Sequence, residues 1–166
     1  SPLHCEWKDH ALFFVDTPGY GEFIGEPIAA ISNSDMVLTL VDAVDGLAIG
    51  ATRAWKIGKA HNVPRAFLVN GMDKDMADFY KVLAQLQEAY GKTVCVPITV
   101  PVGSAANLEK VVNILTSDEV PDEAADYKDQ LMDSIAESDE ELMEKYFETG
   151  ELSEEEIAKG LETAMM

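Results

Sequence analysis

One polar turn in the chain could serve a phosphate site. The segment Asp16-Thr17-Pro18-Gly19 follows an apolar run at residues 11–15 that has the length of a buried strand. A carboxylate at the end of such a strand can hold magnesium through water, and a glycine N–H can approach a terminal phosphate because no Cβ is in the way. These four residues are therefore candidate nucleotide ligands, with Asp16 on the magnesium side. The alternative is a strand that ends in an Asx turn.

A second polar turn could read a nucleobase. The segment Asn70-Gly71-Met72-Asp73 follows the apolar run at residues 65–69. An aspartate there can accept two hydrogen bonds, from the N1–H and the exocyclic amine of guanine, while the asparagine fixes the loop. The alternative is an ordinary strand-to-helix turn, for which Asn-Gly is a standard signal.

The elements that must position these turns alternate along the chain. The nearly continuous apolar runs at residues 11–15, 36–41 and 65–69 are typical of parallel strands covered on both faces. Helical spacing occurs at 23–32, 50–61 and 75–90, the last with an apolar stripe that includes Met76. Residues 3–8 are expected to form an edge strand, joined to Ala11 by a tight turn. This alternation predicts an α/β fold.

The end of the chain is strongly acidic, which indicates a second structural unit. Residues 117–166 hold 18 of the 31 acidic residues and only 3 of the 12 basic ones. Residues 93–100 are predicted to be β-structure, and Asn107 to cap a short helix. The later helices are predicted from an apolar stripe at Ala124, Tyr127, Leu131 and Ile135, and from capping boxes that start at Ser138 and Ser153.

Composition excludes several classes of protein. A hydrophobic content of 47% permits a core and argues against global disorder. The net charge of −19 argues against direct nucleic-acid binding, which depends on cationic side chains. No run approaches the roughly 20 apolar residues of a membrane-spanning helix. Two cysteines make neither a disulfide framework nor a zinc motif, and the N-terminus has no signal-peptide pattern, so we expect a cytoplasmic protein.

The order of the motifs resembles the GTPase domain of bacterial elongation factor G or of a diverged paralogue. The resemblance is carried by DTPGYGEFIGE, SDMVLTLVDAVDGL, VPRAFLVNGMDKDMADFYKVLAQLQEAYG and, in the tail, SIAESDEELMEKYFETGELSEEEIAKGL. It implies a partial P-loop GTPase-type sheet flanked by helices in residues 1–92. Residues 93–166 would be the small α+β insert of this family, with acidic helices.

The resemblance also implies functions for the two turns. Asp16 would be the magnesium-side carboxylate, Gly19 would sense the γ-phosphate, and residues 17 to about 26 would be the second switch. Asn70 and Asp73 would read guanine. The parent protein would bind GTP with magnesium, hydrolyse it to drive ribosomal translocation, and contact the ribosome and its stalk proteins.

Three departures from the family pattern affect this expectation. Tyr20 occupies the position of a histidine that orients the attacking water, and a phenol with a pKa near 10 is a poorer proton acceptor, so slow or conditional hydrolysis is expected. Gly71 replaces a lysine whose aliphatic stem packs on the guanine plane. No phosphate cradle is present, because Gly91-Lys92-Thr93 follows a helix and has Leu86 where a Walker loop requires glycine.

We therefore interpret the chain as an internal fragment that alone neither binds nor hydrolyses GTP and carries no cofactor. In the family's sheet, the missing first strand lies between the strands at 11–15 and 36–41. Because unpaired buried edges are costly, we expect these two strands to pair with each other, or a second copy to pair with them as a dimer. We also expect Asp16 and Asp73 to lie at one rim, facing one nucleotide.

The loop Gly103-Ser104-Ala105 allows two assignments. It could be the final guanine-contacting loop of a small GTPase, but the tail matches family sequence that precedes that loop. We assign it to the start of the insert and expect it to lie apart from Asn70 and Asp73.

Two other functions stay open from the residues alone. One is a non-catalytic protein-interaction module, in which the acidic helices bind a partner. The other is a P-loop-independent α/β enzyme with Asp16 and Asp73 as an acid pair.

Overall fold

An antiparallel hairpin begins the fold. In the computed structural model, which describes residues 2–18 and 25–165, β1 (Pro2–Trp7) pairs with β2 (His10–Val15). Lys8 and Asp9 make the turn with φ values of 46° and 63°, the left-handed conformation of tight hairpin turns. Every residue of both strands is exposed.

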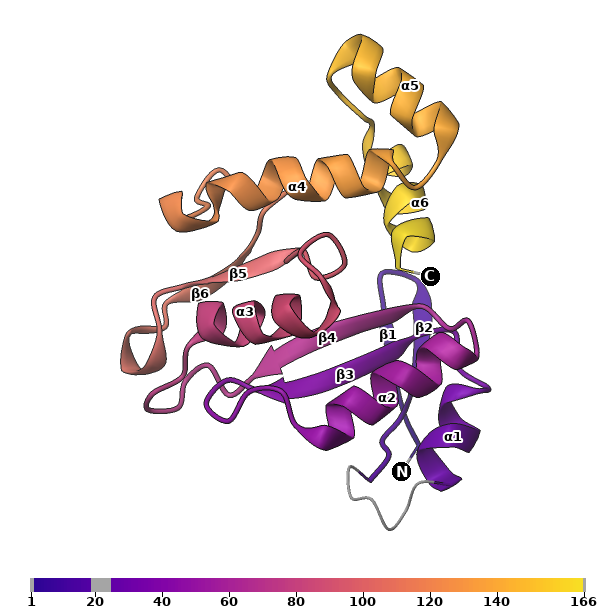
Figure 1. Ribbon diagram of the computed structural model, residues 1–166, viewed down its shortest axis with the longest axis vertical. Coiled ribbons are helices and arrows are strands. Elements are labelled where there is room, and N and C mark those ends of the chain that lie inside the picture. Colours follow the sequence, from indigo (N-terminus) through magenta and orange to yellow (C-terminus); the bar gives the residue numbers. More distant parts are fainter. Residues whose placement is uncertain (1, 19–24, 166) are drawn as a thin grey trace.

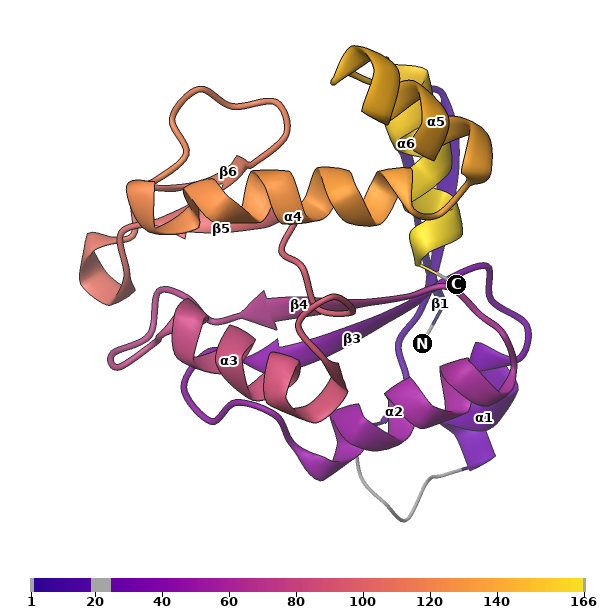
Figure 2. The same cartoon turned by 45° about the horizontal axis from the view of Figure 1, so that its top comes forward.

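The hairpin corrects two expectations. Residues 11–15 are not a buried strand, since the Phe13 side chain is 79% exposed. Neither does β2 pair with the strand at 36–41, because among the described strands it bonds to β1 alone. Figures 1 and 2 show the hairpin running across the direction of the central strands. An apolar run records a preference for burial, but the partner that would bury it must come from elsewhere in the fold.

The central sheet is a parallel pair, β3 (Val37–Asp42) and β4 (Arg65–Asn70), in register from Val37–Arg65 to Asp42–Asn70. The helices α1 (Gly25–Ile31), α2 (Ile49–Ala60) and α3 (Phe79–Tyr90) lie against one of its faces. Val41 there packs among residues of α2 and α3. Only one face is covered, contrary to expectation, because Leu38, Leu40 and Leu68 alternate onto the opposite face and are exposed.

Helix α3 starts later than the spacing predicted. Its first residue is Phe79, and the Asp78 carboxylate caps it by accepting a hydrogen bond from Lys81 N at 3.0 Å. Met76, predicted to lie on the buried stripe, precedes the helix with φ +65° and is 81% exposed. The helical part of the stripe is correct, since Leu83 and Leu86 are buried.

The second part of the chain contains a small antiparallel sheet, β5 (Thr99–Val102) with β6 (Lys110–Asn113). The β-structure expected at 93–100 thus begins only at Thr99. The helix expected after Asn107 is wrong: residues 105–107 form one 3-10 turn and a strand follows. The two adjacent β-branched valines of β6 favour the strand. A second 3-10 turn, Asp122–Ala124, leads into the last helices.

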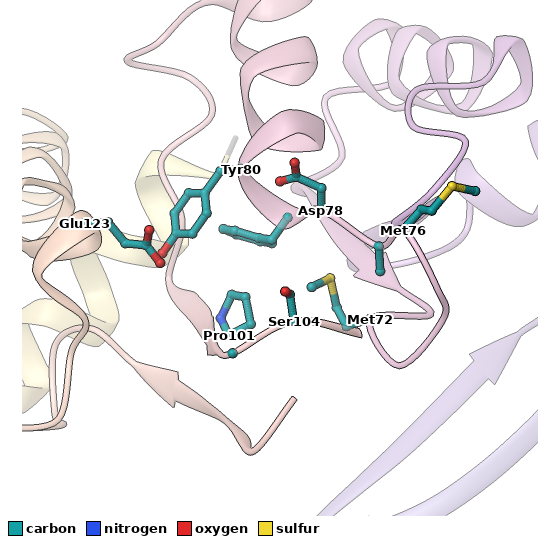
Figure 3. Close-up of a pocket in the computed structure, with 10 residues that line it drawn as sticks. Met72, Met76, Asp78, Tyr80, Pro101, Ser104 and Glu123 are labelled. Atoms are coloured by element: carbon teal, nitrogen blue, oxygen red, sulfur yellow. The ribbon is translucent and has the colours of Figure 1, made fainter. Parts of the chain in front are cut away.

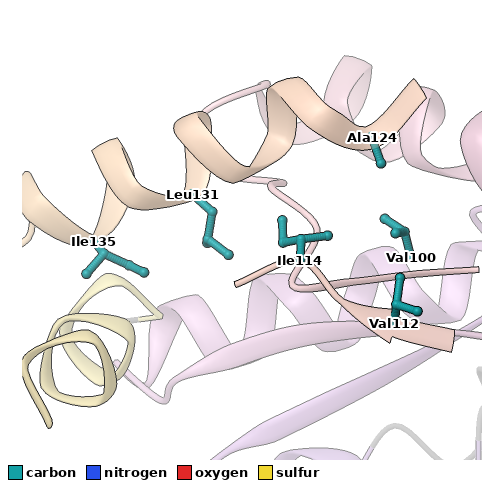
Figure 4. Packing of buried hydrophobic residues seen from close by; sticks show 6 residues of the cluster. All are labelled: Val100, Val112, Ile114, Ala124, Leu131 and Ile135. Carbon is teal, nitrogen blue, oxygen red and sulfur yellow. The ribbon is translucent and has the colours of Figure 1, made fainter. Parts of the chain in front are cut away.

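Three helices complete the fold: α4 (Ala125–Ala136), α5 (Glu140–Thr149) and α6 (Glu154–Ala164). Figure 4 shows α4 lying over the β5–β6 sheet, and the predicted apolar stripe of α4 faces it. The buried cluster here comprises Val100, Val112, Ile114, Ala124, Leu131 and Ile135, the last of which lies against α6.

The two predicted capping boxes had different outcomes. Ser153 and Glu156 form the complete box at the start of α6, as expected. At α5 the cap is Asp139, whose carboxylate accepts from Glu141 N at 2.9 Å, while the Ser138 hydroxyl donates backwards to Ile135 O. Both residues are chemically able to cap, and the exit of the chain from α4 selects the aspartate.

No helix within residues 2–18 and 25–165 is long and apolar enough to cross a membrane.

Candidate guanine-reading site

The two predicted nucleotide turns lie on different parts of the fold. Asp16, Thr17 and Pro18 directly follow β2, and Asp16 is exposed. Gly19, predicted to sense the γ-phosphate, and Tyr20, predicted to orient water, lie outside the described residues. The Asn70–Asp73 loop directly follows β4.

The strands do not bring these turns to a shared rim. β3 and β4 end at the same edge of their parallel pair, but β2 belongs to a different sheet. In Figures 1 and 2 the hairpin crosses their direction, and β2 does not end beside their carboxyl ends. The expected rim that joins Asp16 to Asp73 is therefore not formed by these strands, and this geometry lends no support to the family interpretation.

The Asn70–Asp73 loop has the form of a tight turn with an exposed outer surface. Asn70 O accepts a hydrogen bond from Ala43 N at 2.9 Å, and Gly71 O accepts one from Lys74 N at 3.1 Å. Asn70 and Asp73 are exposed, whereas the Met72 side chain is buried at 8% exposure. The loop thus presents an amide and a carboxylate outward, while Met72 anchors it.

An ion pair that the sequence analysis missed joins this loop to the neighbouring strand. Lys74 Nζ donates to Asp42 Oδ2 at 2.5 Å, and Asp42 Oδ1 accepts from Val44 N at 2.9 Å and Asp45 N at 3.3 Å. The hydrogen bond from Lys74 is the main reason that the pKa of Asp42 is lowered to about 2, and it raises the pKa of Lys74 in turn. The sequence contained a signal for this ion pair. Asp42 directly follows the apolar run at 36–41, and the ends of neighbouring parallel strands lie at the same edge of a sheet.

The side chain of Lys74 lies over Gly71. A Cβ at position 71 would be 2.9 Å from Lys74 Cε and 3.1 Å from Lys74 Cδ. Gly71 also has φ +79°, a conformation that favours glycine. The aliphatic stem therefore occupies the space that a side chain at position 71 would need.

The loop Gly103-Ser104-Ala105 lies against this site, contrary to expectation. Ala105 N donates to Met72 O at 3.1 Å, which places the loop beside the Asn70–Asp73 turn. The expected separation is therefore wrong, and the position of the loop counts against its assignment to the insert. The topology supports the assignment to the insert, because β5, which leads to this loop, pairs antiparallel with β6 and is not a strand of the β3–β4 sheet.

A cavity of about 430 Å³ lies between this loop and the start of α3 (Figure 3). Its lining includes Met72, Met76, Asp78, Tyr80, Ser104 and Glu123. Burial and the neighbouring Glu123 carboxylate raise the pKa of Tyr80 to about 12, so the phenol stays protonated at neutral pH. Asn70 and Asp73 do not line this cavity, so it is separate from the candidate base-reading groups.

Comparison with known proteins identifies similar sequences and a similar fold. The family described as elongation factor Tu GTP binding domain matches residues 1–158. An elongation factor G-like protein of Thermotoga maritima is 33% identical over 94% of this chain and 24% of its own length. A crystal structure of a Thermus thermophilus protein has a TM-score of 0.82 at 27% identity, and covers 99% of this chain and 27% of its own. The chain thus spans about a quarter of these relatives.

Proposed function

The chain belongs to the family of elongation factor Tu GTP-binding domains, and we propose that it is the guanine-reading piece of a translational GTPase resembling elongation factor G. The parent binds and hydrolyses GTP to drive ribosomal translocation in the cytoplasm. Its partners are the ribosome and its stalk proteins. The family match over residues 1–158 supports this proposal, together with the exposed Asn70–Asp73 loop at the end of β4.

The residues of this loop fit the edge of a guanine ring. The exposed carboxylate of Asp73 can accept from both the N1–H and the exocyclic amine, and adenine offers no such pair of donors at the same edge. Asn70, held through its carbonyl by Ala43 N, keeps the loop in register with β3. Met72 acts through its backbone, because its side chain is buried.

Magnesium and the phosphates would be served by the first turn, which requires the hairpin to lie in the parent beside the carboxyl ends of β3 and β4, where this structure does not place it. Asp16 would hold the metal through water, and the turn from Thr17 to Gly19 would lie against the terminal phosphate, with Tyr20 near the attacking water. Within the described ranges, no three His, Cys, Asp or Glu side chains gather to hold a metal. In the parent, phosphate and water oxygens would complete the coordination of magnesium besides Asp16, which is the usual coordination of this ion.

Residues 1–92 would form the partial GTP-binding domain and residues 93–166 the insert. One buried cluster supports this division, since the members of the β5–β6–α4 cluster run from Val96 to Leu161, with Phe79 as the one contribution from α3. Two residues of the proposed insert pack across the boundary, Cys95 in the cluster of Val41 and Leu86, and Leu108 against the cluster of Met72. Without a phosphate cradle, we expect the isolated chain to show no saturable binding of a fluorescent guanine nucleotide at micromolar concentration and no hydrolysis.

Exchange of the base-reading carboxylate tests the function. The variant Asp73→Asn is made in the full natural protein that contains this chain, and it replaces one carboxylate acceptor with an N–H donor. This pattern suits xanthine, which has a carbonyl oxygen next to N1–H where guanine has its exocyclic amine. We expect guanine nucleotide to bind about 10- to 100-fold more weakly and xanthine nucleotide more tightly. Asp75→Asn, at a second exposed aspartate of the same segment, is the control and leaves both affinities unchanged.

If the wild-type full protein does not prefer guanine over adenine and xanthine, or if Asp73→Asn leaves the preference unchanged, the proposal is wrong. In the first case the alternative of a non-catalytic interaction module is favoured. Its acidic helices α4 to α6 would then carry the function.

A further inference from the structure

The Asn70–Asp73 loop reads only the edge of a base, whereas a bound purine also has two broad apolar faces. Hydrogen bonds along the edge fix the ring in its plane, and contact with a face excludes water and holds the ring against the protein. Gly71 offers no side chain for this contact, and the Met72 side chain is buried away from the loop surface. Two long side chains follow in the same turn segment, and of these Met76 lines the cavity at the start of α3, which leaves Lys74.

Lys74 lies where such a cover is needed. Its Cδ and Cε are 3.1 Å and 2.9 Å from the position of a Cβ at residue 71, so the methylene stem lies against the side of the glycine from which a side chain would project. The side chain is still 53% exposed, which leaves part of the stem open to a ligand. A lysine stem is a good apolar surface when its ammonium group is bound elsewhere.

The ammonium group is bound at the end of β3. Lys74 Nζ donates to Asp42 Oδ2 at 2.5 Å, and the backbone N–H groups of Val44 and Asp45 fix the other carboxylate oxygen. Both ends of the lysine are thus held by the protein: the backbone by the turn and the ammonium by Asp42. The stem between them is ordered before any ligand binds, which reduces the entropy cost of using it.

We propose that the aliphatic stem of Lys74, laid across Gly71, forms the apolar cover for one face of the guanine ring, and that Asp42 is its positioning residue. This inference rests on the proposed guanine-reading function and adds to it a binding residue and its support. It also gives Gly71 a role, because any side chain there would displace the stem.

The test uses the full natural protein that contains this chain and a fluorescent guanine diphosphate. We expect Lys74→Ala to weaken binding roughly tenfold through loss of the methylenes, and Lys74→Met, which keeps a stem of similar length, to stay within about threefold of wild type. Asp42→Asn is expected to fall between them, since the stem remains but is less ordered. Gly71→Ala should weaken binding in the wild type and add little in the Lys74→Ala background, because the two changes remove the same contact.

A second readout separates this role from a merely structural one. The cover acts on the ring face, so Lys74→Ala should weaken guanine and hypoxanthine nucleotides equally, whereas Asp73→Asn should affect guanine more. Lys81→Ala, at an exposed lysine on α3, is the control and should change nothing. Wild-type binding of guanine together with unchanged affinity in Lys74→Ala would overturn the inference and leave the proposed function standing. Absence of guanine binding in the wild type would instead overturn the proposed function, and with it this inference.

Discussion

Lys74 Nζ lies 2.5 Å from Asp42 Oδ2, and this contact ties the loop after β4 to the carboxyl end of β3. Asp42 and Asn70 are the last register pair of these strands, so the ion pair continues the strand pairing beyond the sheet. It orders the one polar loop on which the proposed base recognition depends.

The pH response of Asp42 follows from this contact. Its pKa is about 2, against an ordinary 3.8, so its contribution to stability is fully present above about pH 4 and is lost as the pH falls toward 2. Lys74→Met should raise the pKa of Asp42 toward the ordinary value but not fully to it, because Val44 N and Asp45 N still donate. A carbon-detected NMR titration of the aspartate carboxyls measures this.

The matched reference in that titration is Asp139, whose pKa is lowered mainly by Glu141 N and which is remote from the change. Its titration should be the same in wild type and variant. An identical pKa for Asp42 in both proteins would show that the ion pair does not form in solution.

The close approach of α6 to α4 predicts an unusual effect of alanine. In a helix, Gly→Ala is normally stabilising by about 1 kcal/mol. At Gly160 a Cβ would be 2.6 Å from Ile135 Cγ2 and 3.1 Å from Ile135 O, so we expect Gly160→Ala to lower the free energy of unfolding by about 1–3 kcal/mol. Urea denaturation followed by circular dichroism measures the change.

Ile135, which would contact the new methyl group at position 160, supplies the control. Ile135→Ala alone should cost about 2–5 kcal/mol through the cavity that it leaves. The double variant should cost less than the two single changes together, because the smaller side chain at position 135 makes room for the new methyl group. Strict additivity would mean that the two helices are not packed as described.

The uncovered face of the central pair predicts self-association of the isolated chain. β3 pairs with β4 alone among the described strands, and Leu40 is 58% exposed on the open face. We propose that copies of the chain associate through this edge and face, more strongly at higher salt because the net charge of −19 is screened. Leu40→Lys should shift the chain to monomer in analytical ultracentrifugation.

Phe147→Lys provides the comparison, since Phe147 is 81% exposed on α5 and lies outside the central sheet. This variant should associate as the wild type does. A wild-type chain that remains monomeric at high salt and high concentration would contradict the prediction.

Local sequence rules were sufficient for features built from neighbouring residues. The helix at 50–61, the tight turn of the first hairpin, the capping box of Ser153 and the apolar stripe of α4 all appear as expected. Each depends on spacing or on side-chain chemistry within a few residues, so the pattern already contains the interaction.

Features that need a partner from a distant segment were decided by the tertiary structure. The exposure of β2, the contact of Ala105 with Met72, and the pairing of Lys74 with Asp42 all depend on where separate segments meet. The sequence by itself determined an Asn-x-x-Asp turn after a strand and the family to which it belongs. Only the fold decided that a lysine three residues beyond Gly71 would lie across it, because that placement requires the carboxylate at the end of the neighbouring strand.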